Sequence, residues 1–123
     1  MKVEVSVGEI VDKLSILQLK RNNIIESEKL KNVISEYDYL YDIVFKQLNI
    51  HDSDFSELLH INGILWEIED NLREMESRKQ FDDTFIAHAR NVYIINDKRA
   101  EIKKQINLKY GSTFIEEKSY EKY

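Results

Sequence analysis

The chain contains no proline and only three glycines, Gly8, Gly63 and Gly111, among its 123 residues. Folds rich in β-structure need many tight turns, and turns mostly recruit glycine and proline. An all-β sandwich, or an α/β fold with glycine-rich phosphate loops, is therefore not expected. Apolar residues make up 42% of the chain and charged residues 33%, which is typical of a globular domain rather than a disordered one. The composition favours long helices with few connections.

The charge balance excludes several classes of partner. Eighteen basic and 23 acidic residues give a formal net charge of −5. A nucleic-acid module usually presents a basic face, so a nucleic-acid partner is not expected. The absence of cysteine excludes a disulfide framework, a cysteine-ligated zinc site and a thiol nucleophile. The N-terminus carries Glu4 and lacks the apolar core of a signal peptide, and no apolar stretch approaches the roughly 20 residues of a membrane span. We expect a soluble, cytoplasmic protein.

Capping signals and apolar spacing predict four helices, at about 7–25, 28–48, 55–78 and 84–109. Within each helix, apolar residues recur at the i, i+3, i+4 spacing of one buried face. Short loops between long helices imply antiparallel neighbours. The sequence therefore predicts an all-α fold in one domain, residues 1–123, with a short extended N-terminus and an aperiodic C-terminal tail.

Local signals at the helix ends and at the glycines give further expectations. Ser6 and Glu9 form an S-x-x-E capping box, in which each side chain is expected to satisfy the backbone amide of the other. Gly111 stands where a left-handed residue would end the fourth helix. Gly63 lies inside the third helix, where glycine costs roughly 1 kcal/mol relative to alanine. We expect Gly63 to permit the close approach of a neighbouring backbone or ligand. The apolar stripe of the first helix is expected to extend to Ile25.

Some apolar residues lie away from the main stripe of their helix. They are Ile16, Leu19, Tyr39, Ile64, Ile86 and Ile94. A helix that is apolar on two sides usually has a second packing partner. Self-association into a homo-oligomer is therefore one interpretation that the pattern leaves open.

Polar residues at helical spacing form stripes beside the apolar ones on the first, third and fourth helices. The candidate binding residues are Glu9, Asp12, Lys13, Lys20, Asn62, Trp66, Glu69, Arg73, Arg90, Tyr93, Asn96, Asp97 and Arg99. If the stripes face one another, they would line one groove suited to an anionic small ligand, because arginine grips carboxylates and phosphates bidentately. A buried salt-bridge network that fixes helix register would produce the same spacing. A solvent-exposed helix face with a Glu9–Lys13 ion pair would also produce this spacing.

Catalytic and metal motifs are largely missing from the sequence. Glu57-x-x-His60 matches half of a di-iron helix motif, but no second copy exists, so a di-iron site is rejected. Carboxylate pairs such as Glu67-x-x-Asp70 would suit magnesium, although such pairs are common in helices. There is no Walker loop, no G-x-S-x-G and no dinucleotide fingerprint. We predict no metal site, and no cofactor is evident.

Three sequence blocks and a terminal motif resemble a family of short, uncharacterised bacterial and phage proteins, known only as a domain of unknown function. The first block, V-S-V-G-E-I-V-D-K-L-S-I-L, spans residues 5–17 and is followed by Lys20. The second, N-x-x-L-W-x-I-E-D-x-L-R, spans 62–73, and the third, A-R-x-V-Y-x-x-N-D-x-R-A, spans 89–100. The closing E-E-K-S-Y lies at 116–120. The resemblance therefore covers nearly the whole chain.

The resemblance implies no established activity. It implies that the polar stripes share a groove and that the tail is ordered and reaches it. Members occur near glycosyltransferase and surface-polysaccharide genes, which implies an accessory role in a glycan pathway. Our leading hypothesis is a non-catalytic helical module that binds an anionic small molecule or a segment of a protein partner.

Three alternatives stay open, and whether the protein is an enzyme is undecided. One is a helical enzyme similar to chorismate mutase, in which Lys13, Arg73, Arg90 and Arg99 would fix substrate charges. Another is a magnesium-dependent nucleotide pyrophosphohydrolase. The third is a purely structural protein that self-associates.

Overall fold

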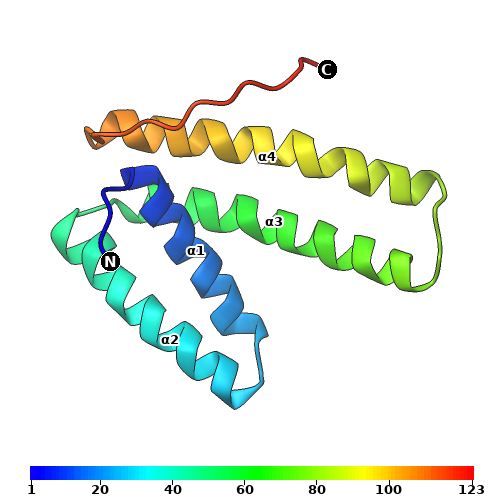
Figure 1. The fold of residues 1–123 in the computed structure, drawn as a ribbon, viewed down its shortest axis with the longest axis horizontal. Coiled ribbons are helices and arrows are strands. Elements are labelled where there is room, and N and C mark those ends of the chain that lie inside the picture. Colours follow the sequence, from blue (N-terminus) through cyan, green and yellow to red (C-terminus); the bar gives the residue numbers. More distant parts are fainter.

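The computed structural model describes all residues, 1–123, and contains helices and no strands (Figure 1). Helix α1 spans Val7–Asn23, α2 spans Ser27–Tyr41, α3 spans Asp52–Ser77 and α4 spans Asp83–Lys109. A π-helical turn, η1, continues α2 over Asp42–Gln47. The predicted all-α fold is confirmed, and the predicted helix bounds differ from the observed ones only at their ends. The π-helical character of the end of the second helix is not visible in the apolar spacing.

The four helices form two antiparallel hairpins, α1–α2 and α3–α4 (Figure 1). Helix α1 packs against α2, α3 and α4, whereas α2 packs only against α1 and η1. Helices α3 and α4 have 26 and 27 residues, and α1 has 17. At a rise of about 1.5 Å per residue, α1 is too short to cover the length of the α3–α4 hairpin. Figure 1 shows α3 and α4 running on together beyond α1. We call residues 69–90, where the hairpin turns, its distal end.

The apolar core lies where α1, η1 and the other helices meet. Val11, Leu14 and Leu17 of α1 are buried at the predicted spacing, and they pack with Leu58 of α3. The prediction for Ile25 is wrong, because this side chain is 95% exposed. Helix α1 ends at Asn23, so the residues after it turn toward α2 and no longer follow the buried face.

Gly8, and not Gly63, is the glycine at which two backbones come close. The Gly8 N–H donates to Asn107 Oδ1 of α4 at 2.6 Å, and a Cβ atom on Gly8 would lie only 2.6 Å from Lys103 O. A Cβ on Gly63 would have Leu19 Cδ2 at 3.9 Å as its nearest neighbour, which is an ordinary contact. No neighbouring backbone comes close at Gly63, so that part of the expectation is wrong. The close approach belongs to the N-terminus of α1, where it crosses α4.

The caps of α1 and α4 meet at the same place. Gly111 has a φ of +64°, as predicted, and the Ser112 N–H then donates to Asn107 O at 2.8 Å. Ser6 Oγ accepts from the Glu9 N–H at 3.2 Å, which is one half of the predicted capping box. The Glu9 carboxylate does not complete the other half, because it turns toward α4.

The C-terminal tail, residues 112–123, has no regular secondary structure and runs back along α4 (Figure 1, red). This path places the end of the chain over the middle of α4. None of the helices combines the length and the apolar character that crossing a membrane requires.

Candidate functional site

An ion pair between a buried aspartate and a half-buried arginine joins α1 to α4. Asp12 is 1% exposed, and its two carboxylate oxygens accept from Arg99, Oδ1 from Nε at 2.9 Å and Oδ2 from Nη2 at 2.5 Å. The hydrogen bonds to Asp12 raise the pKa of Arg99 above its usual range. Bidentate geometry of this kind fixes both distance and orientation. The pair therefore sets how α4 lies across α1.

Helix α3 contributes to the same pair from the other side. Asn62 Nδ2 donates to Asp12 Oδ1 at 2.9 Å and to Ser15 Oγ at 2.7 Å. Ser15 Oγ in turn donates to the Asp12 backbone carbonyl at 2.7 Å. All three residues are buried, and no buried side-chain nitrogen or oxygen in the protein lacks a hydrogen-bond partner. Asp12 is thus the point at which three helices meet.

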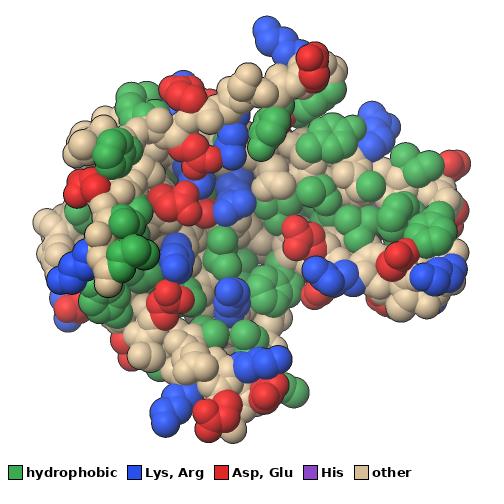
Figure 2. All heavy atoms as spheres, viewed as in Figure 1, with side chains coloured by type: hydrophobic (Ala, Val, Ile, Leu, Met, Phe, Trp, Pro, Cys, Tyr) green, Lys and Arg blue, Asp and Glu red, His purple; other side chains and the backbone are tan.

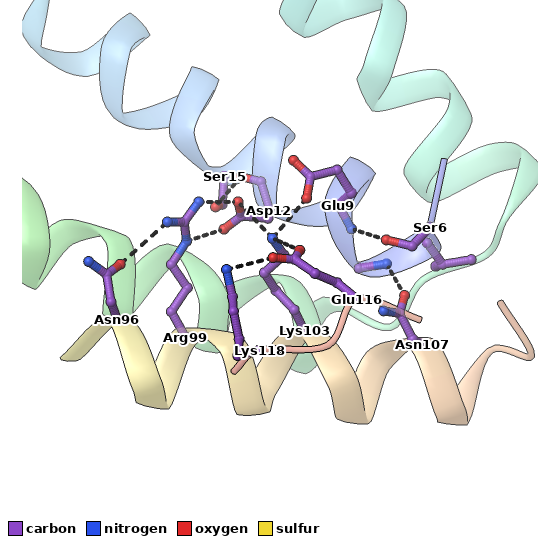
Figure 3. A network of polar contacts seen from close by, with 12 residues as sticks. Ser6, Glu9, Asp12, Ser15, Asn96, Arg99, Lys103, Asn107, Glu116 and Lys118 are labelled. Carbon is purple, nitrogen blue, oxygen red and sulfur yellow. Dashed lines mark hydrogen bonds and ion pairs between the residues drawn. The ribbon is translucent and has the colours of Figure 1, made fainter. Parts of the chain in front are cut away.

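A second set of charges extends this centre toward the surface (Figure 3). Lys103 Nζ lies 2.8 Å from Glu9 Oε2 and 3.2 Å from Glu116 Oε2 in the tail. Lys118 Nζ lies 2.6 Å from the other oxygen of Glu116. Hydrogen bonds from Lys118 and then Lys103 hold the pKa of Glu116 below its usual range. We call these charged residues the polar cluster: Glu9, Asp12, Arg99, Lys103, Glu116 and Lys118.

A hollow of about 480 Å³ lies beside the polar cluster, between α4 and the tail. We call it the tail hollow; it is lined by Val92, Tyr93, Asn96, Asp97, Arg99, Ala100, Lys103, Lys118, Tyr120, Glu121 and Tyr123. Tyr123 is held at its edge, because its hydroxyl donates to Asp97 Oδ2 at 2.6 Å and its ring packs edge-on against Tyr93. This hydrogen bond raises the pKa of Tyr123. The tail thus reaches the α4 part of the predicted stripes, at Tyr93, Asn96, Asp97 and Arg99.

The cations of the tail hollow gather at the polar cluster. Arg99, Lys103 and Lys118 belong to both. Figure 2 shows basic and acidic side chains crowded in the middle of this face, with hydrophobic side chains more frequent toward the distal end. The hollow therefore combines hydrogen-bond donors of positive charge with aromatic rings.

The predicted binding residues do not all line one groove. Six of them lie in the polar cluster, in the tail hollow or in both: Glu9, Asp12, Tyr93, Asn96, Asp97 and Arg99. Asn62 is buried against Asp12. Lys13 instead pairs with Glu36 of α2 at 3.2 Å, so the predicted Glu9–Lys13 pair is wrong. Lys20 lies in the last turn of α1, away from both places.

Three of the remaining candidates lie elsewhere along the α3–α4 hairpin. Trp66 lines a separate hollow of about 390 Å³, with Leu19 of α1 beside it. Glu69 and Arg73 line a third hollow, of about 820 Å³, at the distal end. Their spacing suits an ion pair, but none forms between them within 4 Å. A single groove lined by all three stripes is therefore not what the fold builds.

Arg90 is exposed and makes no ion pair. The four cations that a chorismate-mutase-like site would need therefore do not converge. Lys13 pairs on the α2 side of α1, Arg99 is bound to Asp12, and Arg73 lies at the distal end. Asp12 itself has both oxygens engaged, so it acts as an ion-pair partner and not as a free base.

The set of candidate binding residues leaves out the two cations that share the tail carboxylate, Lys103 and Lys118. Helical spacing places Lys103 one turn after Arg99, so the signal for Lys103 was present in the sequence. Glu116 and Lys118 lie in an aperiodic segment, where only the terminal motif marks them and nothing indicates their partner. No three histidine, aspartate or glutamate side chains are grouped as a metal site would require.

The fold and the polar cluster define a class of small helical protein, in which an ion pair on a buried aspartate joins two hairpins and a C-terminal tail lines a polar hollow. Residues 1–123 match the model of a family of unknown function, DUF6165. The chain belongs to this family, in agreement with the resemblance of its sequence blocks. We find no match among curated proteins and none among solved structures.

Proposed function

We propose that the protein is a binding module and that the tail hollow holds an anionic small molecule. The observation that carries the proposal is the placement of Arg99, Lys103 and Lys118 around one hollow of about 480 Å³. This volume falls within the range of small-molecule sites, about 300–1,000 Å³. Lys103 and Lys118 together already hold one carboxylate, that of Glu116. An anionic group is therefore the chemistry that this position accepts.

The aromatic side of the hollow favours an anion carried on a ring. Tyr93, Tyr120 and Tyr123 line it, and aromatic faces pack well against planar rings and against the apolar faces of sugars. Asn96 and Asp97 add an amide and a carboxylate that can bond hydroxyl groups. A sugar phosphate or sugar acid is a ligand of this type. The glycan-pathway role that the resemblance implies makes such ligands the first to test.

Calorimetry at low ionic strength tests the proposal with glucose 1-phosphate and phenyl phosphate, and with inorganic phosphate as a probe that has no ring. We expect both ring-bearing probes to bind more tightly than inorganic phosphate. Lys103→Gln should weaken their binding about tenfold or more, because a hydrogen bond to a charged group contributes about 1.5–3 kcal/mol. Lys104→Gln is the matched control, since Lys104 lies next in the chain but pairs with Glu117 outside the hollow.

Two outcomes would overturn the proposal. One is that neither the wild-type protein nor its Glu116→Gln variant binds any of the probes. The other is that Lys104→Gln weakens binding as much as Lys103→Gln does. Because Lys103 is only 12% exposed, its substitution can also disturb the fold. Lys118→Gln is the second test variant, since Lys118 lies in the tail and its loss leaves the helices intact. Pyrophosphate release from nucleoside triphosphates and Mg²⁺ would instead favour the hydrolase alternative.

A second candidate function, self-association, is favoured by the distal end. Its hollow is lined partly by Leu72 and Phe85, and Phe81 and Ile86 nearby are 54% and 52% exposed. Arg73 lies between Glu69 and Glu76 on α3, an arrangement that complements itself about a two-fold axis. We infer that a second copy of the chain covers this face.

Sedimentation analysis tests this second candidate. Wild type should form a dimer, and Phe81→Lys should shift it to a monomer. Tyr39→Lys on α2 serves as the control, because Tyr39 is also an exposed aromatic residue but lies far from the distal end in the chain. A strictly monomeric wild type overturns the inference.

A further inference from the structure

We propose further that Glu116 stands in for the anion of the ligand, so that the C-terminal tail competes with the ligand for Lys103 and Lys118. The inference rests on the proposed function, because it names how that same site is regulated. When a ligand binds, its phosphate or carboxylate replaces the Glu116 carboxylate between the two ammonium groups.

The contacts of Glu116 are those that an incoming anion would need. One carboxylate oxygen lies 3.2 Å from Lys103 Nζ and the other lies 2.6 Å from Lys118 Nζ (Figure 3). Lys103 Nζ also lies 2.8 Å from Glu9 Oε2 of α1, a contact that does not involve the tail. The departure of Glu116 therefore leaves Lys103 in place and still partly paired. The position is built partly on α4, through Lys103, and partly on the tail, through Lys118, and its occupant Glu116 also comes from the tail.

Charge counting supports the exchange. The polar cluster holds three cations and three anions, so its formal net charge is zero while Glu116 is docked. Removing the Glu116 carboxylate leaves one positive charge without a counter-charge. A monoanionic group on a ligand would restore the balance. Two further carboxylates line the tail hollow, Asp97 and Glu121, and the first of these is held by the Tyr123 hydroxyl.

The tail is attached firmly at its start and weakly beyond. Ser112 is hydrogen-bonded to α4 and to α1, since its N–H donates to Asn107 O and its Oγ accepts from the Val7 N–H at 3.0 Å. No backbone–backbone hydrogen bond joins residues 113–123 to the rest of the protein. Side-chain contacts at the surface hold this segment, and exposed ion pairs are individually weak. Glu116 can therefore leave while Ser112 keeps the tail tethered.

Two anchors keep the rest of the hollow in place during this exchange. Ser112 holds one end of the segment, and Tyr123 holds the other through Asp97 and Tyr93. The segment between them carries both Glu116 and Lys118. Removing the whole tail would therefore remove the competitor and part of the site together. Substitution of Glu116 alone separates the two roles.

The expected change in ligand affinity depends on the fraction of time for which Glu116 leaves Lys103 and Lys118 free. If Glu116 occupies it about nine-tenths of the time, the apparent affinity of a ligand is reduced roughly tenfold. Glu116→Gln should therefore bind phenyl phosphate and glucose 1-phosphate about tenfold more tightly than the wild type. Glu117→Gln is a closely matched control, because it removes the same charge from the next residue, whose partner Lys104 does not line the hollow.

Calorimetry of the full-length wild type, Glu116→Gln and Glu117→Gln distinguishes the outcomes. Tighter binding by Glu116→Gln alone supports the inference, including the case in which only this variant binds measurably. If the wild type binds but Glu116→Gln binds equally or more weakly, tail competition is overturned and the proposed function stands. If neither protein binds any probe, both are overturned. Nuclear magnetic resonance adds a second readout, since saturating probe should shift the backbone amides of residues 114–118 in the wild type.

Discussion

The two ends of the α3–α4 hairpin carry similar residues and use them differently. Where α1 crosses, the Asp12 carboxylate is buried and is bonded in bidentate fashion by the half-buried Arg99. At the distal end, Glu69 and Arg73 are spaced for an ion pair, yet they stay exposed and unpaired. The difference is helix α1, which excludes solvent from one end of the hairpin and is too short to do so at the other. Charged stripes become a network only where a neighbouring helix covers them.

The largest predicted loss of stability is at the end of the α3–α4 hairpin that α1 covers. Asp12→Ala removes the acceptor of Arg99 and of Asn62, and breaking a buried pair from one side costs about 3 kcal/mol or more. The free energy of unfolding from urea titration measures this loss. Glu69→Ala is the control at the distal end and should change stability by about 0.5 kcal/mol or less. Equal effects at both sites would contradict the comparison.

Substitution of Gly8 and of Gly63 by alanine should change stability in opposite directions. Gly8→Ala would place a Cβ against Lys103 O in the backbone of α4, and forced overpacking typically costs about 1–3 kcal/mol. Gly63→Ala meets only ordinary contact inside α3, so it should stabilise the protein by about 0.5–1 kcal/mol. Thermal unfolding of both variants should thus give shifts of opposite sign. Destabilisation by Gly63→Ala would restore the close approach that the sequence suggested there.

The arginines outside the covered region should matter least for stability. Arg73→Ala and Arg90→Ala remove exposed groups without ion pairs, so each should change the free energy of unfolding by about 0.5 kcal/mol or less. Urea titration at low protein concentration measures the monomer alone. A much larger loss that grows with protein concentration would show that the distal end is buried in an assembly.

The smallest predicted effect is the pH dependence of the contacts that Glu116 makes in the tail. Hydrogen bonds from Lys118 and Lys103 lower the pKa of Glu116 below its ordinary value of 4.5. A lowered folded-state pKa means that the contact is complete above pH 4.5 and is lost only as the pH falls through the lowered value. The backbone amide resonances of residues 114–118 should therefore stay constant from pH 7 to pH 5 and shift in more acidic solution. Glu116→Gln should abolish this step, and a step that persists in the variant would assign it to another carboxylate.

Much of the fold could be predicted because helix formation is mainly local. Apolar spacing placed the buried residues Val11, Leu14 and Leu17, and Gly111 marked the end of α4 correctly. The candidate site was predicted less completely. Asp12, Asn62 and Arg99 do converge, but Lys13 turns toward α2 and Arg73 lies far along the hairpin. Spacing defines which residues share a face of one helix, and it does not define which faces meet.

The sequence by itself determined the helices, the Ser6 cap of α1, the end of α4 at Gly111 and the family to which the chain belongs. These features depend on interactions within a few residues or on a pattern that can be read directly. Only the tertiary structure decided that Gly8 is a contact point of α1 and α4, that Lys103 shares Glu116 with Lys118, and that the tail lines a hollow. Those contacts join residues about 100 positions apart or lie in an aperiodic tail. They depend on the crossing of two hairpins, which no local pattern encodes.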